Sequence, residues 1–401
     1  MNAVGIDVSR GKSTVTILRP FGEIVAPPFE IKHTRDDINS LIDLINSTDG
    51  ESRVVMEYTG RYHEVLVHHL SSSDIFVSTV NPKRVKDFDN DTLRKVKSDK
   101  ADSVKLARYG IDKWDSLQQY SRMDELRTQL KSMNRQFAFY TDHKAAMKNN
   151  LISILELTYP GSNEYFTSPS RSDGHQKWID FAYTYWHVDC VRNQSLSAFL
   201  DHYKKWCKRN KYSFSETKAN YIYEQAQNIA PVLPKDDLTK SLVKQAAGEL
   251  ISLSTTVEAL RTLMDQTASK LPEYPIVLSM KGVGPSLGPQ IIAEIGDITR
   301  FSNKGALTAF AGVDPGVNSS GTHTQKSVHT TKRGSTHLRK SLFQVMDALI
   351  KNAPEGDPVY EFMIKKRLEG KPYYVYMTAG CNKFLRIYYG RVKEYLEQIA
   401  E

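Results

Sequence analysis

The N-terminal part of the chain begins with three short apolar runs. They cover residues 2–8, 12–18 and 23–29, and two segments of turn-like composition, Ser9-Arg10-Gly11 and Pro20-Phe21-Gly22, separate them. Apolar runs of this length, bounded by glycine, proline and serine, are typical of β-strands. The pattern therefore predicts a three-stranded meander.

Helical and strand-like patterns alternate after the meander. Thr34 precedes a segment in which Ile38, Leu41 and Ile45 recur at helical spacing, so we expect Thr34 to be a helix N-cap. The elements predicted next are a strand over 53–58, a helix over 62–71, a strand over 75–80 and a helix from about residue 99. This order is that of the ribonuclease-H-like fold, and it predicts an α/β domain of the RuvC type over residues 1–118. In that fold the acid of the first strand lies at the sheet centre, beside the start of the fourth strand.

Residues 119–271 have a different hydrophobic pattern. Apolar side chains recur at alternating spacings of four and three, first from Leu126 to Ile154 and again from Val243 to Met264, with Lys144 as the one break in the first seam. This heptad spacing predicts two long helices, each with a continuous apolar seam. Two interpretations stay open: a pair of long helices within one globular domain, and an antiparallel coiled coil that also mediates oligomerisation.

An aromatic and basic segment over residues 159–234 separates the two seams. It holds three of the four tryptophans and the run His202-Tyr-Lys-Lys-Trp-Cys-Lys-Arg-Asn-Lys-Tyr212. Interleaved aromatic and basic residues suit stacking on unpaired bases together with phosphate contacts. An amphipathic helical subdomain whose lysines face water explains the same composition, and both interpretations stay open.

The C-terminal part, residues 272–401, is predicted to be mainly helical. The segment from Met280 to Gly296 has the glycine pattern of a helix-hairpin-helix turn, whose backbone N–H groups can meet a phosphate at a helix N-terminus. A plain tight turn before a helix has the same pattern. The other elements expected here are a helix over 302–310, a loop over 311–321 and helices over about 335–352, 357–369 and 375–398.

Four carboxylates in the first 102 residues form the candidate catalytic and metal site. Asp7 and Glu57 each interrupt an apolar strand pattern, where an unpaired carboxylate is costly to bury. Asp99 and Asp102 are three residues apart in a helical run, so both lie on one helix face, roughly 5–6 Å apart. A divalent cation stabilises like charges held this close, and hard oxygen ligands favour Mg²⁺, with Mn²⁺ as the alternative. Each acid taken alone also suits an ordinary strand end, N-cap or solvated helix face.

The composition is that of an ordinary soluble protein, and its charge favours a polyanionic partner. The 401 residues are 40% hydrophobic and carry a net charge of +8. Nine lysines and arginines lie between Lys83 and Arg108, and a second basic cluster with three histidines runs from His323 to Lys340, as expected of a nucleic-acid-binding protein. The three widely spaced cysteines fit neither a disulfide framework nor a zinc site. Because no apolar run is long enough to span a membrane and no signal-peptide pattern is present, we expect a cytoplasmic protein.

Six short motifs occur in a specific order along the chain. They are Gly5-Ile-Asp-Val8, Glu57-Tyr-Thr-Gly60, Asn81-Pro82, Lys97-Ser-Asp-Lys-Ala-Asp102, Ala311-Gly-Val-Asp-Pro315 with Ser319-Ser-Gly321, and Lys332-Arg-Gly334. This combination resembles the transposases of insertion sequence family one-ten, the bridge-RNA-guided recombinases. The resemblance covers about residues 1–158 and 240–400. The segment 159–234 looks like an insertion relative to shorter members, and no role is carried over to it.

The resemblance implies a site, a nucleophile and partners. A RuvC-like DEDD metal site matches Asp7, Glu57, Asp99 and Asp102, and a serine nucleophile in the C-terminal transposase domain matches Ser320. The resemblance also implies a homo-oligomer, a tetramer built from dimers, that binds double-stranded donor and target DNA and a structured guide (bridge) RNA, in association with the nucleoid of a prokaryotic cell. The basic residues expected to contact nucleic acid are Lys83, Arg84, Lys97, Lys281, Lys326, Lys332, Arg333 and Arg339.

The expected reaction is site-specific recombination through a covalent phosphoserine. Serine attack on a phosphodiester needs removal of the hydroxyl proton and positive charge around the developing phosphorane, which a metal ion on the four carboxylates supplies if the two domains meet. Ser320 lies in Asn318-Ser-Ser-Gly321, which is also ordinary turn chemistry, and Ser319 is the adjacent competitor. Tyrosine, the other usual recombinase nucleophile, is absent from residues 275–359. Two other functions stay open: a Holliday-junction or structure-specific nuclease without serine chemistry, and a non-enzymatic RNA-binding protein.

Overall fold

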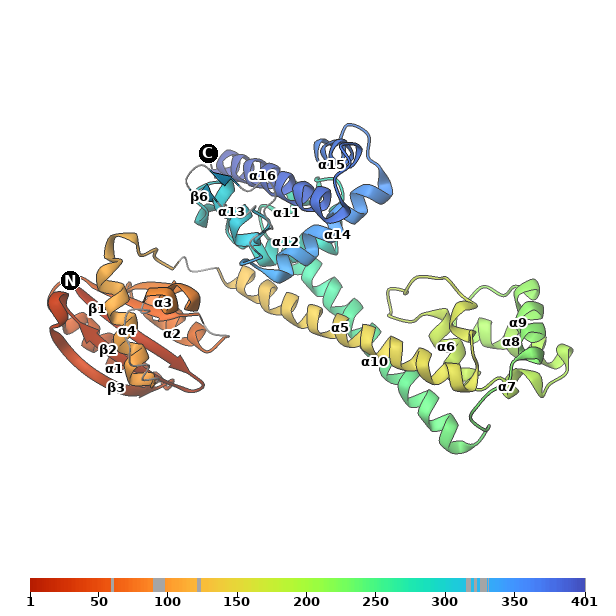
Figure 1. Ribbon diagram of the computed structural model, residues 1–401. Coiled ribbons are helices and arrows are strands. Elements are labelled where there is room, and N and C mark those ends of the chain that lie inside the picture. The colour runs from red at the N-terminus through yellow and green to blue at the C-terminus, as the bar shows by residue number, and fades with distance from the viewer. Residues whose placement is uncertain are drawn as a thin grey trace. The chain divides into compact units, whose positions relative to one another are not determined.

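The chain forms two compact units, Met1–Arg122 and Met123–Glu401. The computed structural model describes residues 1–58, 61–88, 98–120, 124–314, 319–320, 323–324, 330 and 332–400 (Figure 1). The division into three parts at residues 118 and 271 stays a prediction. Among the residues that the structure describes, no helix is both long and apolar enough to cross a membrane.

The N-terminal unit is built on a five-stranded mixed sheet with the order β3-β2-β1-β4-β5. The strands are β1 (Asn2–Ser9), β2 (Lys12–Leu18), β3 (Ile24–Lys32), β4 (Ser52–Glu57) and β5 (Phe76–Val80). The first three pair antiparallel, and β4 and β5 continue the sheet parallel to β1. The predicted meander and α/β class are confirmed, and the strand order is consistent with a ribonuclease-H-like domain.

Four α-helices of this unit are described: α1 (Arg35–Ser47), α2 (His63–Ser72), α3 (Pro82–Phe88) and α4 (Asp99–Asp112). Thr34 is the N-cap of α1, as predicted, because its side chain accepts a hydrogen bond from the Asp37 amide at 3.3 Å. The buried face of α1 packs against the β-strand core. The short helix α3 was not predicted, since its sequence was interpreted only as the start of a basic cluster.

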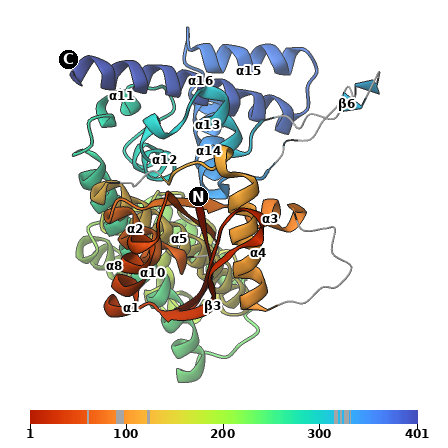
Figure 2. The same cartoon turned by 90° about the vertical axis from the view of Figure 1, so that its left-hand side faces the viewer.

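Helix α4 packs along the sheet against β1 and β2 (Figure 1, Figure 2). The hydroxyl groups of Thr16 on β2 and Ser103 on α4 form a buried hydrogen bond of 2.7 Å. Gly110, in the last turn of α4, leaves room for Ala3 and Val55, whose side chains would lie 3.1 and 3.0 Å from a Cβ at residue 110. Small residues thus let this helix lie close to the centre of the sheet.

Two long helices, α5 (Glu125–Thr158) and α10 (Asp237–Ala268), pack side by side in the C-terminal unit (Figure 1). Leu151 near the end of α5 shares a buried cluster with Val243 near the start of α10, and Leu130 near the start of α5 shares another with Met264. The helices are therefore antiparallel. The two predicted helices are confirmed, whereas the coiled coil and its role in oligomerisation stay predictions.

The aromatic segment between the long helices is helical. It contains α6 (Lys177–Thr184), α7 (Asp189–Arg192), α8 (Leu196–Arg209) and α9 (Glu216–Asn228). Tyr203 and Trp206 are 0% and 3% exposed and lie in one aromatic core with Phe181, while Lys204 and Lys205 are exposed. The interpretation of these two rings as base-stacking platforms is wrong, because they are packed against other rings. The amphipathic subdomain is the interpretation that fits.

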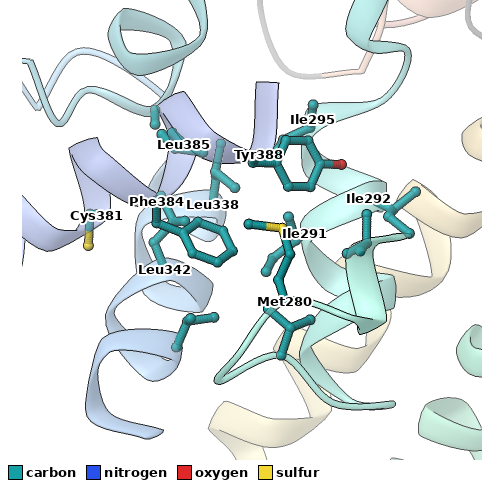
Figure 3. Close-up of a cluster of buried hydrophobic side chains, with 14 of the residues drawn as sticks. Met280, Ile291, Ile292, Ile295, Leu338, Leu342, Cys381, Phe384, Leu385 and Tyr388 are labelled. Carbon is teal, nitrogen blue, oxygen red and sulfur yellow. The ribbon is translucent and has the colours of Figure 1, made fainter. Parts of the chain in front are cut away.

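The rest of the C-terminal unit is mainly helical, as predicted. Its elements are α11 (Tyr274–Leu278), α12 (Leu287–Ile295), α13 (Lys304–Ala311), β6 (Ser319–Ser320), β7 (His323–Thr324), α14 (Thr336–Asn352), α15 (Pro358–Leu368) and α16 (Tyr373–Ala400). Side chains from α12, α14 and α16 meet in the core shown in Figure 3. The turn between α11 and α12 packs on α14, since a Cβ at Gly282 would lie 3.0 Å from the Val345 carbonyl oxygen.

Candidate functional site: four carboxylates and a serine hairpin

Asp7 and Glu57 lie on adjacent parallel strands. Ile6 of β1 is opposite Met56 of β4, and each acid is the next residue along its strand. The two carboxylates therefore belong to the same edge of the sheet, at the carboxyl end of β4. The expectation that Asp7 lies beside the start of the fourth strand was wrong. In the parallel register Asn2 is opposite Ser52 at the start of β4, so Asp7 lies beside the carboxyl end of that strand.

The other two acids, Asp99 and Asp102, lie in the first turn of α4. Ser98 begins the helix, and its side chain accepts a hydrogen bond from the Ala101 amide at 3.2 Å. Carboxylates in a first turn are favoured by the positive end of the helix dipole. The close approach of α4 to β1 at Gly5 brings this turn to the sheet edge that carries Asp7.

The raised pKa of Asp7 indicates that the four acids interact electrostatically. Burial raises the pKa of this carboxyl to about 6, and the negative charges of Asp102, Asp99 and Glu57 act in the same direction. The pKa of Glu57 is also raised, by burial and by Asp102, while Lys105 opposes the shift. The structure thus brings the four acids into one electrostatic cluster with an excess of negative charge.

The chemistry of this cluster fits a hard divalent cation. Its donors are carboxylate oxygens, which Mg²⁺ and Mn²⁺ prefer, and a cation would relieve the repulsion that raises the pKa of Asp7. In the described ranges of the chain, however, no three His, Cys, Asp or Glu side chains are close enough to hold a metal ion. The acids interact through charge but are not arranged as a coordination shell, so the metal site stays a prediction.

Lys105 also belongs to this region, although the sequence analysis included it only among the nine basic residues between Lys83 and Arg108. It lies three residues after Asp102 on α4, and its charge acts on Glu57 across the boundary between helix and sheet. The spacing from Asp102 was the available signal, because residues three apart share a helix face.

Ser320 lies on a short hairpin of the C-terminal unit. It is opposite His323, and Ser319 is opposite Thr324, so β6 and β7 pair antiparallel. A loop was expected over residues 311–321, and the two serines instead form a strand because their backbone is paired. Lys97 and Lys326 lie outside the described residues, and so do the side chains of Lys83, Ser319 and Ser320.

A hollow of about 1410 Å³ lies at the base of this hairpin, and we call it the hairpin hollow. Gly312 and Thr330, which flank the hairpin in sequence, both line it, and none of its described lining residues is an Asp or a Glu. The cations that line the hollow come from several helices and are Lys304, Lys332, Arg339, Lys340, Lys383 and Arg386. A concave surface with charge of one sign attracts the opposite charge, here a phosphate backbone.

Two predicted nucleic-acid contacts, Lys332 and Arg339, belong to this hollow. The Arg339 guanidinium donates hydrogen bonds of 3.0 Å to the carbonyl oxygens of Ala311 and Gly334, and burial lowers its pKa. Arg339 therefore fixes the two ends of the hairpin segment as well as contributing charge. The other described candidates, Arg84, Lys281 and Arg333, have exposed side chains and are not among the residues lining the hollow.

A buried carboxylate, Glu294, connects three helices near the hairpin. This 1%-exposed side chain accepts hydrogen bonds from Asn134 at 2.8 Å, Arg135 at 3.0 Å and Ser335 at 2.9 Å. Ser335 is the N-cap of α14, the first helix after the hairpin. The sequence interpretation missed this network, although a glutamate within the apolar run Ile291–Ile295 was a signal.

Two family models match this chain. Residues 4–160 match the model for DEDD transposases of IS110, described as "Transposase", and residues 274–361 match the model described as "Transposase IS116/IS110/IS902 family". Asp7, Glu57, Asp99 and Asp102 lie in the first match and Ser320 lies in the second.

Two relatives from insertion elements are also similar. The IS116 uncharacterized 44.8 kDa protein of Streptomyces clavuligerus is 28% identical over 153 residues, 38% of either chain. The IS110 uncharacterized 43.6 kDa protein of Streptomyces coelicolor is 24% identical over 140 residues, 35% of this chain and 34% of the relative. The chain thus spans little more than a third of the length of these relatives. The chain therefore carries, in order, two transposase domains of the IS110 family, insertion sequence family one-ten.

Proposed function

We propose that this protein is an insertion-sequence transposase that acts as an RNA-guided, site-specific DNA recombinase. Cleavage depends on Mg²⁺ bound by Asp7, Glu57, Asp99 and Asp102, and the nucleophile is Ser320. The observation that carries the proposal is the cluster of four acids, in which the charges of Asp102, Asp99 and Glu57 all raise the pKa of Asp7. The two transposase family matches, over residues 4–160 and 274–361, support it.

The acid cluster supplies a binding site rather than a proton donor. In the described part of the chain the four acids outnumber the cations that interact with them, which are Lys105 beside Glu57 and Lys12 beside Asp99. A divalent cation bound there would place positive charge against a scissile phosphate and lower the pKa of an attacking hydroxyl. The role of the chain's own residues is to hold the oxygen donors on rigid elements, two on strands and two on a helix.

The serine step exchanges one phosphoester for another. The Ser320 Oγ forms a bond to phosphorus as the bond from phosphorus to the 3′ oxygen breaks. The hydroxyl proton of serine is lost and the leaving 3′ oxygen gains a proton, so the products are a 5′-phosphoserine and a free 3′ hydroxyl. Attack by the 3′ hydroxyl of another strand reverses these changes. Rejoining therefore needs no ATP, which suits recombination better than hydrolysis.

The partners follow from family and charge. Lys332, Arg339 and Lys383 of the hairpin hollow are suited to hold the DNA backbone near the hairpin by charge-assisted contacts. The guide RNA and the tetramer are proposed from the resemblance and the paired long helices. Light scattering of the protein with and without copurified RNA tests the oligomer, and a monomer in both samples would contradict it.

The test of the function uses labelled duplex DNA that carries the ends of the element, with copurified RNA and Mg²⁺. We expect joined product from the wild type and neither joined nor cut product from Asp7→Asn. Asp43→Asn, the same change at an exposed position of α1, is the matched control and should act like the wild type. Cut product without joined product would indicate the nuclease alternative, and nucleic-acid binding without any cleavage by the wild type would indicate the RNA-binding alternative.

A further inference from the structure

Lys144, the one break in the apolar seam of α5, lines a second hollow in the C-terminal unit. This hollow has a volume of about 850 Å³, lies between α5, α10 and α14, and is reached by Trp178 of the inserted subdomain. We call it the α14 hollow. A lysine in an apolar seam is unfavourable unless its ammonium group has a partner, so the position calls for an explanation.

The α14 hollow is basic. Five cations line it against one acid, and they are Lys144, Lys148, Arg261, Lys340 and Lys351, with Asp347 as the acid. Arg261 pairs with Glu258 at 2.7 Å and Lys340 with Asp142 at 2.9 Å. Asp347 accepts a hydrogen bond from the Tyr373 hydroxyl at 3.0 Å.

The remaining three lysines have no carboxylate partner among the residues that the structure describes. Within the part of the chain that the structure describes, no carboxylate oxygen lies within 4.0 Å of the ammonium groups of Lys144, Lys148 or Lys351. Lys144 is half-buried and reaches only the Ser170 hydroxyl, at 3.5 Å. Burial lowers its pKa, and the charges of Arg261 and Lys148 act in the same direction against Glu258. Among the described residues, three lysines of the cluster thus have no ion pair with a carboxylate.

The α14 hollow adjoins the hairpin hollow. Lys340 lines both, and the residues of α14 that line the two hollows extend from Thr336 to Asn352. From Lys340 to Lys351 the helix axis covers about 16 Å, a length along which one strand of a duplex carries about five phosphates. Cations spread over this length, from Lys340 to Lys351, fit an extended polyanion better than a single small anion.

We propose that the α14 hollow holds the phosphodiester backbone of the nucleic acid bound at the hairpin hollow, with Lys144 and Lys148 as direct phosphate contacts. The inference rests on the proposed function in one respect, that the ligand of this unit is nucleic acid. It adds a second contact, built by the long helices and α14, away from the serine hairpin. Its proposed role is to hold the strand.

The first test is the salt dependence of binding by the Lys144→Gln/Lys148→Gln double variant, measured with duplex DNA and with the copurified RNA in separate arms. Loss of two phosphate contacts should reduce the slope of log affinity against log salt by about 2 and weaken binding at least tenfold near 0.1 M salt. The arm that shows the loss identifies which nucleic acid occupies the hollow. Lys144→Arg/Lys148→Arg should restore the slope, because it keeps both charges, and Lys270→Gln, an exposed lysine beyond the end of α10, is the control.

The second test is protection of lysines from an amine-acetylating reagent, mapped by mass spectrometry. Nucleic acid should protect Lys144 and Lys148 and leave Lys270 reactive. Equal protection by inorganic phosphate at the same phosphate concentration would overturn the polymer contact, as would an unchanged salt slope in the double variant. A wild type that joins no strands while both lysines are protected would refute the proposed function and leave this inference standing.

Discussion

Gly5 of β1 and Ser103 of α4 meet backbone to backbone: a Cβ at residue 5 would lie 2.1 Å from the Ser103 carbonyl oxygen. It would also lie 2.3 Å from the amide nitrogen of Ala107. No side chain fits at residue 5 unless α4 moves away from the sheet. Because Asp102 directly precedes Ser103, this contact sets the position of the acid pair relative to Asp7.

Gly5→Ala should therefore displace α4 and destabilise the N-terminal unit by about 1–3 kcal/mol, the usual cost of overpacking. Hydrogen exchange of the α4 amides, measured with the thermal midpoint, localises the effect. Gly248→Ala on α10 is the control, since a Cβ there meets nothing within 4 Å and alanine favours a helix. Unchanged exchange in α4 of Gly5→Ala would show that the helix does not depend on this contact.

The raised pKa of Asp7 predicts a pH dependence of stability without metal. The ordinary pKa is 3.8 and the folded value about 6, so the folded state binds a proton more tightly than the unfolded state. Stability should accordingly fall as pH rises from about 4 to about 6 and stay level above that. A shift of this size corresponds to about 3 kcal/mol, which solvent screening of the half-buried carboxyl reduces to about 1 kcal/mol.

Asp7→Asn should remove this fall, whereas the exposed Asp43→Asn should keep it. The free energy of unfolding is measured by urea denaturation at a series of pH values, and hydrogen exchange of the β1 amides locates the effect in the N-terminal unit. An identical pH profile for Asp7→Asn and the wild type would contradict the charge cluster.

Mg²⁺ should stabilise the N-terminal unit more at pH 8 than at pH 5, because the carboxylates must lose their protons to bind it. Thermal midpoints with and without Mg²⁺ test this. Glu57→Gln should lose the stabilisation and Asp43→Asn should retain it. A Mg²⁺ effect of equal size in all three proteins would point to non-specific ion binding.

Glu294 should be important for the stability of the C-terminal unit. Glu294→Ala leaves Asn134 and Ser335 without their acceptor and Arg135 without its charge partner, at a cost of about 3 kcal/mol. Denaturant unfolding measures the loss. In the exposed ion pair of α16 between Lys393 and Glu397, Glu397→Ala should cause no measurable change. Equal stabilities of the two variants would refute the role of the network.

The periodic parts of this fold were predictable from sequence. The strands of the meander, the Thr34 cap and the two long helices follow from alternation and spacing that local chemistry enforces. Asp7 and Glu57 were recognisable as a pair because strand order brings distant acids to one edge. The spacing of Phe199, Tyr203 and Trp206 along α8 also placed these rings on one helix face, a signal of a core that the basic neighbours obscured.

The remaining features depend on tertiary contacts. Asn134 and Glu294 are 160 positions apart, so no local pattern predicts their hydrogen bond. The backbone pairing of Ser320 with His323 involves two residues on each side, too few for strand periodicity to appear. The sequence did not reveal that Gly5 makes room for α4, because a glycine can occur in an apolar strand for several other reasons.

The central claim is that Ser320 is the covalent nucleophile and works with the acid cluster of the same or another subunit. Ser320→Ala removes one oxygen, so stability should change by less than about 0.5 kcal/mol and nucleic-acid binding should persist, while recombination stops. Ser319→Ala is the matched control and should remain active.

The most direct measurement is digestion of a trapped protein–DNA adduct, followed by mapping of the modified residue by mass spectrometry. We expect a phosphoserine link at Ser320 in the wild type and no adduct in Ser320→Ala or Asp7→Asn. A link at Ser319, or full recombination without the Ser320 hydroxyl, would contradict the assignment.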